Sequence, residues 1–367
     1  MNFEDVLERS TRSRIVITGA SGVIGRALIE LLGINGVSGA GTLQAKRVPN
    51  VLALDRKPAH YLLPKNVDFE LVDLLDDKLP LEKLFENCEV VFHLAARMPQ
   101  ARFSEAQFRH TNVDATARLT QACRDAGVRR LVFASTIEVY GVQPVEDPLD
   151  EDDAKVFTGH YSRNKFESET ELLELSKDGG LETVALRMPM IFGPGFYHEK
   201  SMIALFIAVR LGLPVPLPTA DAPVVFVSSR DTARAFMQAA FASDAQGKAF
   251  NITAADNPTM LEFFRQAIDL ADSHSRTLIV RRTWVEKLVE LAVEKATSPS
   301  DKVPILGTPA ELVPYILTGG KYSIERARKV LGFEPLDNCS QSWLSAYQWY
   351  WNQSWSEKYR VTVRECV

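Results

Sequence analysis

Short hydrophobic runs alternate with longer amphipathic stretches through the first half of the chain. The runs are rich in β-branched residues and predict strands at residues 14–18, 51–55, 69–73, 90–95, 130–135 and 183–187. Stretches such as residues 103–126 and 161–176 have the pattern of amphipathic helices. Continuous hydrophobic strands that alternate with helices indicate a parallel sheet covered on both faces, which is a doubly wound α/β fold.

This alternation becomes irregular after residue 187, where prolines become frequent. We therefore assign residues 1–187 to the doubly wound domain, and residues 188–223 and 254–367 to a smaller second region. Hydrophobic runs at residues 224–227 and 248–252 predict strands that return to the main sheet, so residues 224–253 are assigned to the first domain.

Composition and charge narrow the class of protein. The 367 residues are 46% hydrophobic and 24% charged, as in an ordinary globular chain. The net charge is −5 and no basic stretch is long enough to follow a phosphate backbone, so nucleic acid is not expected as a partner. The longest hydrophobic run, residues 202–209, is too short to span a membrane, and residues 1–14 lack the hydrophobic core of a signal peptide.

The cysteines indicate a reducing compartment. Cys88, Cys123, Cys339 and Cys366 lie far apart and form no CxxC or Cys/His cluster. They are interpreted as free thiols of a cytoplasmic protein, and the sequence offers no metal site. Two segments stand outside the predicted elements. We interpret residues 33–50, which are rich in glycine, as a surface insertion, and residues 146–153, with six acids in eight positions, as a solvated loop.

A glycine-rich turn follows the first predicted strand directly. The string TGASGVIG places Gly19, Gly22 and Gly25 at three-residue spacing before a helical run. In a strand–turn–helix context such glycines permit a tight turn, a close approach of the backbone to a pyrophosphate, and close packing of helix on strand. The sequence therefore predicts a Rossmann-type dinucleotide-binding domain. Asp55 ends the second predicted strand, where a carboxylate accepts hydrogen bonds from the adenosine ribose. This favours NAD, although Arg56 and Lys57 keep NADP as an alternative.

A tyrosine and a lysine at Tyr161 and Lys165 lie four residues apart on a predicted helix, and therefore on one helical face. Tyrosine is a poor base at neutral pH because its usual pKa is near 10. A neighbouring ammonium favours the phenolate, so the pair is suited to general acid–base catalysis.

Several motifs in the same order resemble the extended short-chain dehydrogenase/reductase family over residues 14 to about 253. They are TGxxGxxG, Asp73, the run His93–Ala96, Asn112, the pair Ser135–Thr136, and Tyr161 with Lys165. The resemblance implies that Tyr161 is the acid/base, that Lys165 holds the nicotinamide ribose and lowers the pKa of the tyrosine, and that Thr136 binds the reacting oxygen. It implies a small-molecule substrate and a homodimer. The implied cofactor-binding residues are Gly19, Ser21, Gly22, Val23, Ile24, Gly25, Asp55, Arg56, Asp73, Leu74, Leu94, Ala95, Ala96, Asn112, Ser135, Tyr161, Lys165 and Pro189.

The branch of the family is less sharply defined. Nucleotide-sugar enzymes typically have an asparagine where this chain has Met190, and an arginine in a run that here begins at Val224. Both substitutions remove polar contacts to a diphosphate. The strings LRMPMIFGPG and YSIERARKVLGFEP look more like the 3β-hydroxysteroid dehydrogenase and ketoreductase branch.

Glu138 is either a second catalytic carboxylate or a structural residue. Because Ile137 stands where 4,6-dehydratases have an acid, that activity is not expected. Met98, Thr136, Glu138 and Met190 are the candidate substrate contacts. The expected activity is hydride transfer at a secondary alcohol or ketone. A nucleotide-sugar epimerase or decarboxylase with tightly bound NAD is one alternative, and a non-catalytic dinucleotide-binding regulator is another. Four tryptophans between residues 343 and 355 suggest a helix over the core of the second region, with the substrate pocket or a partner subunit as alternatives.

Overall fold

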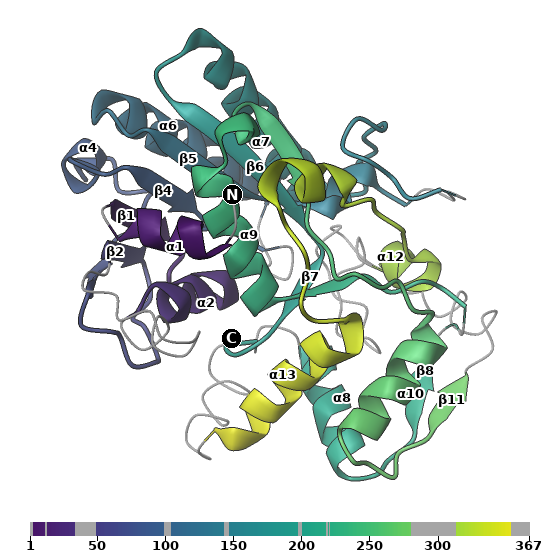
Figure 1. Cartoon of the computed structure of the whole chain (residues 1–367). Helices are drawn as coiled ribbons and strands as arrows, with labels where there is room; N and C mark the ends of the chain where they lie inside the picture. The colour runs from purple at the N-terminus through teal and green to yellow at the C-terminus, as the bar shows by residue number, and fades with distance from the viewer. Residues whose placement is uncertain are drawn as a thin grey trace.

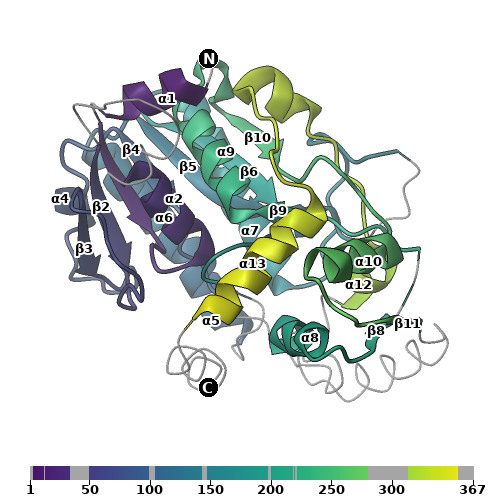
Figure 2. The same ribbon diagram turned by 60° about the horizontal axis from the view of Figure 1, so that its bottom comes forward.

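The structure is a computed structural model that describes residues 3–11, 13–33, 49–98, 104–142, 147–196, 200–217, 219, 221–279 and 313–353. A twisted sheet lies between two layers of helices, and a second group of helices and short strands lies to one side of it (Figures 1 and 2). The seven strands of the main sheet run in the order β10-β6-β5-β4-β1-β2-β3, and all neighbouring pairs are parallel. The predicted doubly wound fold is confirmed.

Most predicted strands of the first half have nearly the expected bounds. The strands of the main sheet are β1 (Arg14–Thr18), β2 (Asn50–Asp55), β3 (Val67–Leu71), β4 (Val90–His93), β5 (Arg130–Thr136), β6 (Glu182–Met188) and β10 (Lys248–Asn251). β3 begins two residues before the expected position, so Asp73 lies beyond its end, and β4 ends at His93 rather than at residue 95.

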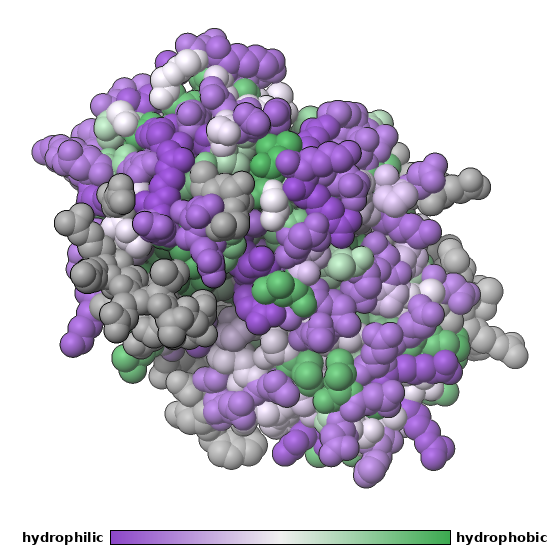
Figure 3. Space-filling view, in the orientation of Figure 1, coloured by the Kyte–Doolittle hydropathy of each residue, from purple (hydrophilic) through white to green (hydrophobic). Residues whose placement is uncertain are grey.

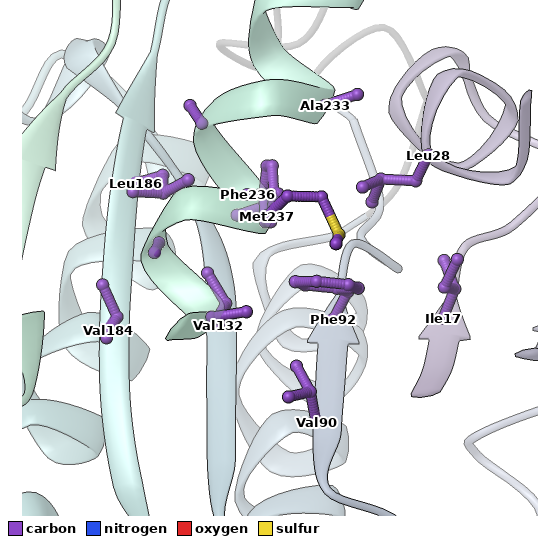
Figure 4. Packing of buried hydrophobic residues seen from close by; sticks show 14 of the residues in the cluster. Ile17, Leu28, Val90, Phe92, Val132, Val184, Leu186, Ala233, Phe236 and Met237 are labelled. Carbon is purple, nitrogen blue, oxygen red and sulfur yellow. The ribbon is translucent and has the colours of Figure 1, made fainter. Parts of the chain in front are cut away.

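One face of the sheet is covered by α1 (Phe3–Ser10), α2 (Val23–Leu32) and α9 (Ser229–Phe241). Figure 4 shows Phe236 and Met237 of α9 above the side chains of four strands. Phe236 meets Phe92 of β4 edge to face, with ring centroids 5.8 Å apart. α9 packs beside α2 in this layer although it begins only at Ser229, far along the chain from the glycine-rich turn.

The opposite face is covered by α4 (Leu81–Leu84), α6 (Ala115–Asp125) and α7 (His160–Leu175). The shorter elements of the first half are α5 (Glu105–Arg109), a π-helical turn η1 (His110–Asp114), and the 3₁₀ turns η2 (Ile137–Tyr140) and η3 (Ser176–Asp178). Alternate residues of β1 divide between the layers: Ile15 and Ile17 belong to the cluster under α2 and α9, and Val16 belongs to the cluster under α6 and α7. Burial on both faces explains why the strands are hydrophobic throughout.

One strand prediction is wrong: the run at residues 224–227 does not join the main sheet. Its strand, β9 (Phe226–Ser228), pairs with β7 (Met190–Phe192) in a separate two-stranded sheet. Pro189 separates β7 from β6, and because proline has no N–H to donate, the chain leaves the main sheet there. Residues 248–251 do join the main sheet, as β10 beside β6.

The second group of elements is built around aromatic side chains. It contains β8 (Val215–Leu217) paired with β11 (Thr277–Ile279), and the helices α8 (Lys200–Arg210), α10 (Met260–Leu270), α12 (Val313–Thr318) and α13 (Cys339–Asn352). The short turns η4 (Ser243–Ala245) and η6 (Ala327–Leu331) instead pack with α9 in the core of the main sheet. Trp343 of α13 is fully buried and meets Phe206 of α8 with centroids 5.4 Å apart. The face in Figure 3 is mainly hydrophilic, with small scattered hydrophobic groups. Residues 34–48 of the predicted surface insertion, Trp355 and Cys366 lie outside the described part of the chain.

Candidate active site

The turn between β1 and α2 has no room for side chains at two of its glycines. Gly19 has a φ of +70°, and a Cβ there would lie 2.7 Å from the backbone nitrogen of Ala95, just after β4. A Cβ at Gly25 would lie 2.6 Å from Cα of Ala20. Glycine alone therefore allows the ends of β1 and β4 and the start of α2 to approach this closely.

The start of α2 is open to a ligand through its backbone. Gly22 caps the helix, is exposed, and supplies no side chain to the cap. The side chains of Val23 and Ile24 pack in hydrophobic clusters, so these residues present backbone N–H groups, which have no partner within the helix. The strand order reverses between β1 and β4, which is where doubly wound sheets bind ligands. The turn fits the pyrophosphate of a dinucleotide.

Asp55 stands beside this turn and is half-buried at the end of β2. Its Oδ2 accepts a hydrogen bond from the backbone N–H of Ser21 at 2.9 Å, and its Oδ1 accepts one from Lys57 at 3.0 Å. Each carboxylate oxygen retains further acceptor capacity, which suits the hydroxyls of a ribose. Asp73, which follows β3 at the same edge of the sheet, is exposed and accepts a bond from the N–H of Leu75.

The segment after β4 continues along the same edge of the sheet. Leu94, Ala95 and Ala96 are half-buried there, as is Leu74 after β3, whereas Arg56 after β2 is exposed. The segment is anchored by Asn112 in the π-helical turn, whose Oδ1 accepts from the N–H of Arg97 at 2.7 Å and whose Nδ2 donates to the carbonyl of Arg97 at 3.0 Å. Both hydrogen-bonding groups of the Asn112 amide are thereby used to hold the loop.

His93 has a structural place within this edge. Its Nδ1 lies 2.8 Å from Oγ1 of Thr18, and its Nε2 lies 2.9 Å from Oγ1 of Thr116. Burial, with a smaller contribution from Lys165, lowers the pKa of His93 to about 3, so the ring is neutral. A neutral histidine bonded on both sides joins β4 to β1 and α6.

Thr136 ends β5 and begins η2. Its Oγ1 accepts a hydrogen bond from the N–H of Glu138 at 3.2 Å. No described residue accepts the hydroxyl hydrogen of Thr136, which leaves it available to donate to a substrate oxygen. Glu138 itself is half-buried, and its backbone carbonyl accepts a bond from the hydroxyl of Tyr315 at 2.7 Å.

Tyr161 and Lys165 occupy the first two turns of α7, which packs against β5, β6 and η2. Tyr161 is buried, and its hydroxyl lies 3.7 Å from Sδ of Met98, which follows β4 and is 41% exposed. Lys165 is 2% exposed, with its Nζ 3.9 Å from the ring centroid of Phe133. Burial lowers the pKa of Lys165 to about 7, against a raising influence of Glu169.

Glu169 and Arg187 are buried charged residues that lie outside the sequence motifs of the predicted site. They form an ion pair at 1% and 4% side-chain exposure, and the Ser135 hydroxyl donates to the Glu169 carboxylate. Ser135 therefore offers a ligand its backbone rather than its hydroxyl hydrogen. The spacing of Glu169, four residues after Lys165, was a usable signal in the sequence. Tyr315 was also missed, and no sequence pattern connects it with Glu138.

Pro189 and Met190 lie between the sheet and the second group of elements. Both are half-buried, and Met190 packs against the aromatic cluster that contains Phe206 and Trp343. The residue that replaces the asparagine of nucleotide-sugar enzymes is thus part of a hydrophobic surface.

Among the described residues, no group of three or more His, Cys, Asp or Glu side chains is arranged to hold a metal ion. No helix within the described ranges is both long and hydrophobic enough to cross a bilayer.

Comparison with known proteins gives consistent matches. Residues 15–253 match the profile of the "NAD dependent epimerase/dehydratase family". The chain is 28% identical to UDP-glucose 4-epimerase of Vibrio cholerae over 57% of its own length and 60% of that protein, which is less than two thirds of the relative. It is 26% identical to 3beta-hydroxysteroid-dehydrogenase/decarboxylase isoform 1 of Arabidopsis thaliana over 88% of its own length and 76% of that protein.

A solved structure is similar over nearly the whole chain. MoeE5, in complex with UDP-glucuronic acid and NAD, has a TM-score of 0.68 and 25% identity, covering 92% of this chain and 98% of that one.

Proposed function

The chain belongs to the NAD dependent epimerase/dehydratase family, and on that premise we propose that it transfers hydride between NAD and a carbon that bears a secondary hydroxyl or a ketone. The observation that supports the proposal is that Tyr161 lies in the first turn of α7, which packs on β5, the strand that ends at Thr136. The Thr136 hydroxyl accepts from the N–H of Glu138 and donates to no other described residue.

In the proposed reaction, Thr136 and Tyr161 bind the substrate oxygen and transfer its proton. In the oxidation direction, Thr136 donates a hydrogen bond to the substrate oxygen, and the Tyr161 phenolate accepts the hydroxyl proton. The ammonium of Lys165, one turn later on the same face, favours the phenolate by its charge. In the reduction direction Tyr161 returns the proton. When bound, NAD supplies the hydride acceptor, or, once reduced, the hydride donor.

The proposed cofactor-binding residues lie along the edge of the main sheet where its strands end. The backbone of Ser21 to Gly25 would hold the pyrophosphate, and Asp55 the adenosine ribose. Asp73 and Leu74 would flank the adenine, the segment 94–96 would line the cofactor, and Pro189 would lie beside the nicotinamide. Lys165 would contact the nicotinamide ribose.

A largely hydrophobic substrate fits the described surface. The thioether of Met98 lies against the Tyr161 hydroxyl, and Met190 continues into the aromatic cluster. A buried diphosphate would need paired donors that Met190 does not supply. We therefore favour a hydroxyl or ketone on a hydrophobic skeleton.

Nucleotide-sugar epimerisation is the second candidate, because MoeE5, which binds UDP-sugars and NAD, matches 92% of the chain. The two candidates are separated by incubating the protein and NAD with hydrophobic secondary alcohols and, separately, with UDP-glucose. Net formation of reduced cofactor with an alcohol, and none with UDP-glucose, supports dehydrogenation. Conversion of UDP-glucose to its C4 epimer without accumulation of reduced cofactor supports epimerisation and contradicts the proposal.

A further inference from the structure

A buried charged cluster lies one helical turn along α7 from Lys165. Arg187 on β6 binds the carboxylate of Glu169, with its Nε 3.0 Å from Oε1 and 3.2 Å from Oε2. Ser135 on β5 donates its hydroxyl to the same carboxylate. All three side chains are at least nine-tenths buried.

Structural stability alone is a weak explanation for this cluster. Removing two charges from water costs free energy that their attraction only partly recovers, and well-packed hydrophobic side chains often replace a buried ion pair without loss. The neighbourhood of Glu169 suggests another role, because a charge in a low-dielectric interior acts strongly on other charges nearby.

The negative charge of Glu169 favours the protonated form of Lys165. The Nζ of Lys165 lies on the face of Phe133 and makes no hydrogen bond with any other described residue. Burial opposes its charge, and Glu169 is the group whose charge raises its pKa. Phe133 on β5 contacts the Nζ of Lys165, and the charged or titratable groups that interact with Lys165 are His93 on β4 and Glu169 on α7. Ser135 on β5 and Arg187 on β6 hydrogen-bond to the Glu169 carboxylate.

Among these, Glu169 is the anion. His93 is neutral, since burial and Lys165 lower its pKa to about 3. We propose that Glu169 is a positioning residue that keeps Lys165 an ammonium inside the protein, and that it thereby keeps Tyr161 competent for proton transfer. The inference rests on the proposed function, because the charge of Lys165 affects turnover only if Tyr161 is the acid/base.

Side chains from neighbouring strands hold the Glu169 carboxylate in place. Arg187 also donates from Nη1 to the hydroxyl of Tyr140 at 2.7 Å, and that hydroxyl donates to Oδ1 of Asn251 at 2.7 Å. The cluster therefore extends from α7 through β6 to the end of β10, and Glu169 cannot turn away from Lys165 without breaking several buried hydrogen bonds.

Loss of the Glu169 charge is expected to lower the pKa of Lys165. The ammonium of Lys165 is present below a pKa of about 7 and is lost as the pH rises through it. Loss of a neighbouring opposite charge lowers such a pKa by about 1–3 units. The alkaline limb of kcat/KM should move to lower pH by the same amount.

The test compares the wild type, Glu169→Gln, Glu169→Gln/Arg187→Gln and Glu169→Asp. The double variant leaves no unpaired guanidinium and remains informative if Glu169→Gln alone does not fold. Glu167→Gln is the matched control, because Glu167 lies on the same helix and pairs with the half-exposed Arg109. Lysine labelled with ¹³C at Cε reports the pKa of Lys165 by NMR without any turnover, and Lys165→Met assigns the resonance.

We expect Lys165 to titrate near 7 in the wild type and in Glu167→Gln, about 1–3 units lower in the double variant, and close to the wild-type value in Glu169→Asp. An unchanged pKa of Lys165 in the double variant overturns the inference and leaves the proposed function standing. A lowered pKa with an unmoved kcat/KM profile contradicts the catalytic role of Lys165, and with it the proposed function.

Discussion

Replacing Gly19 by alanine should affect the chain in two separable ways. A left-handed backbone costs an alanine about 1–2 kcal/mol relative to glycine. The new Cβ would also lie 2.7 Å from N and 2.9 Å from Cα of Ala95, and these are backbone atoms that cannot rotate away. Overpacking of this kind typically adds about 1–3 kcal/mol. We therefore expect Gly19→Ala to lower the free energy of unfolding by about 2–5 kcal/mol.

Gly127 provides a matched control. Its φ is +69°, close to the +70° of Gly19, but a Cβ there would meet no atom within 4 Å. Gly127→Ala should therefore show the conformational cost alone, about 1–2 kcal/mol. The difference between the two variants in urea-induced unfolding isolates the contact with the segment after β4.

The same variants test the dinucleotide turn. At 100 times its Kd, NAD should stabilise the wild type and Gly127→Ala by about 2.7 kcal/mol. Gly19→Ala should lose most of that gain at the same NAD concentration, because the turn can no longer approach a pyrophosphate. Equal stability of the two alanine variants, together with equal stabilisation by NAD, would refute this reading of the turn.

Three further predictions concern single side chains. Asp55→Asn should weaken the binding of NAD about tenfold and reduce the preference for NAD over NADP, as measured by calorimetric titration of both cofactors. An unchanged ratio of the two Kd values would contradict the assignment of Asp55 to the adenosine ribose. Arg26→Ala should destabilise the chain by about 1 kcal/mol, because Arg26 lies over the ring of Trp349 at 5.5 Å, whereas Glu30→Gln, which removes only an exposed ion pair, should cost less. Burial lowers the pKa of His93 to about 3, so on acidification the unfolded state binds the histidine proton before the folded state does. Between pH 6.5 and 3 the free energy of unfolding should therefore fall by about 1.4 kcal/mol per pH unit because of this group. In denaturation experiments at graded pH, His93→Gln should show a smaller slope.

The fold was predictable because local pattern and global packing agree in the first half. β5 is buried at all seven positions, and its sequence, RLVFAST, is correspondingly short of charge. The expected family and NAD as its cofactor are confirmed by the profile that spans residues 15–253. The glycine-rich turn was predictable because Gly19 and Gly25 have no room for a side chain, and this requirement is visible as the glycine spacing in the sequence.

Other features depend on contacts between distant residues and leave no local pattern. The strand at residues 226–228 has the composition of a main-sheet strand, but it pairs with β7, which follows Pro189, and not with a strand of the main sheet. His93 belongs to the motif run His93–Ala96, and the sequence does not show that Thr18 and Thr116 hold both of its ring nitrogens. The homodimer and the cytoplasmic location stay predictions.

The central claim is that Tyr161 carries the proton during hydride transfer. The most direct measurement is a single-turnover experiment with the wild type and Tyr161→Phe, each saturated with NAD and an alcohol that the wild type oxidises. Removing a positioned acid/base should slow formation of reduced cofactor by about 10²–10⁴-fold, with the Kd for NAD nearly unchanged. A Tyr161→Phe variant that reduces NAD at the wild-type rate would contradict the account.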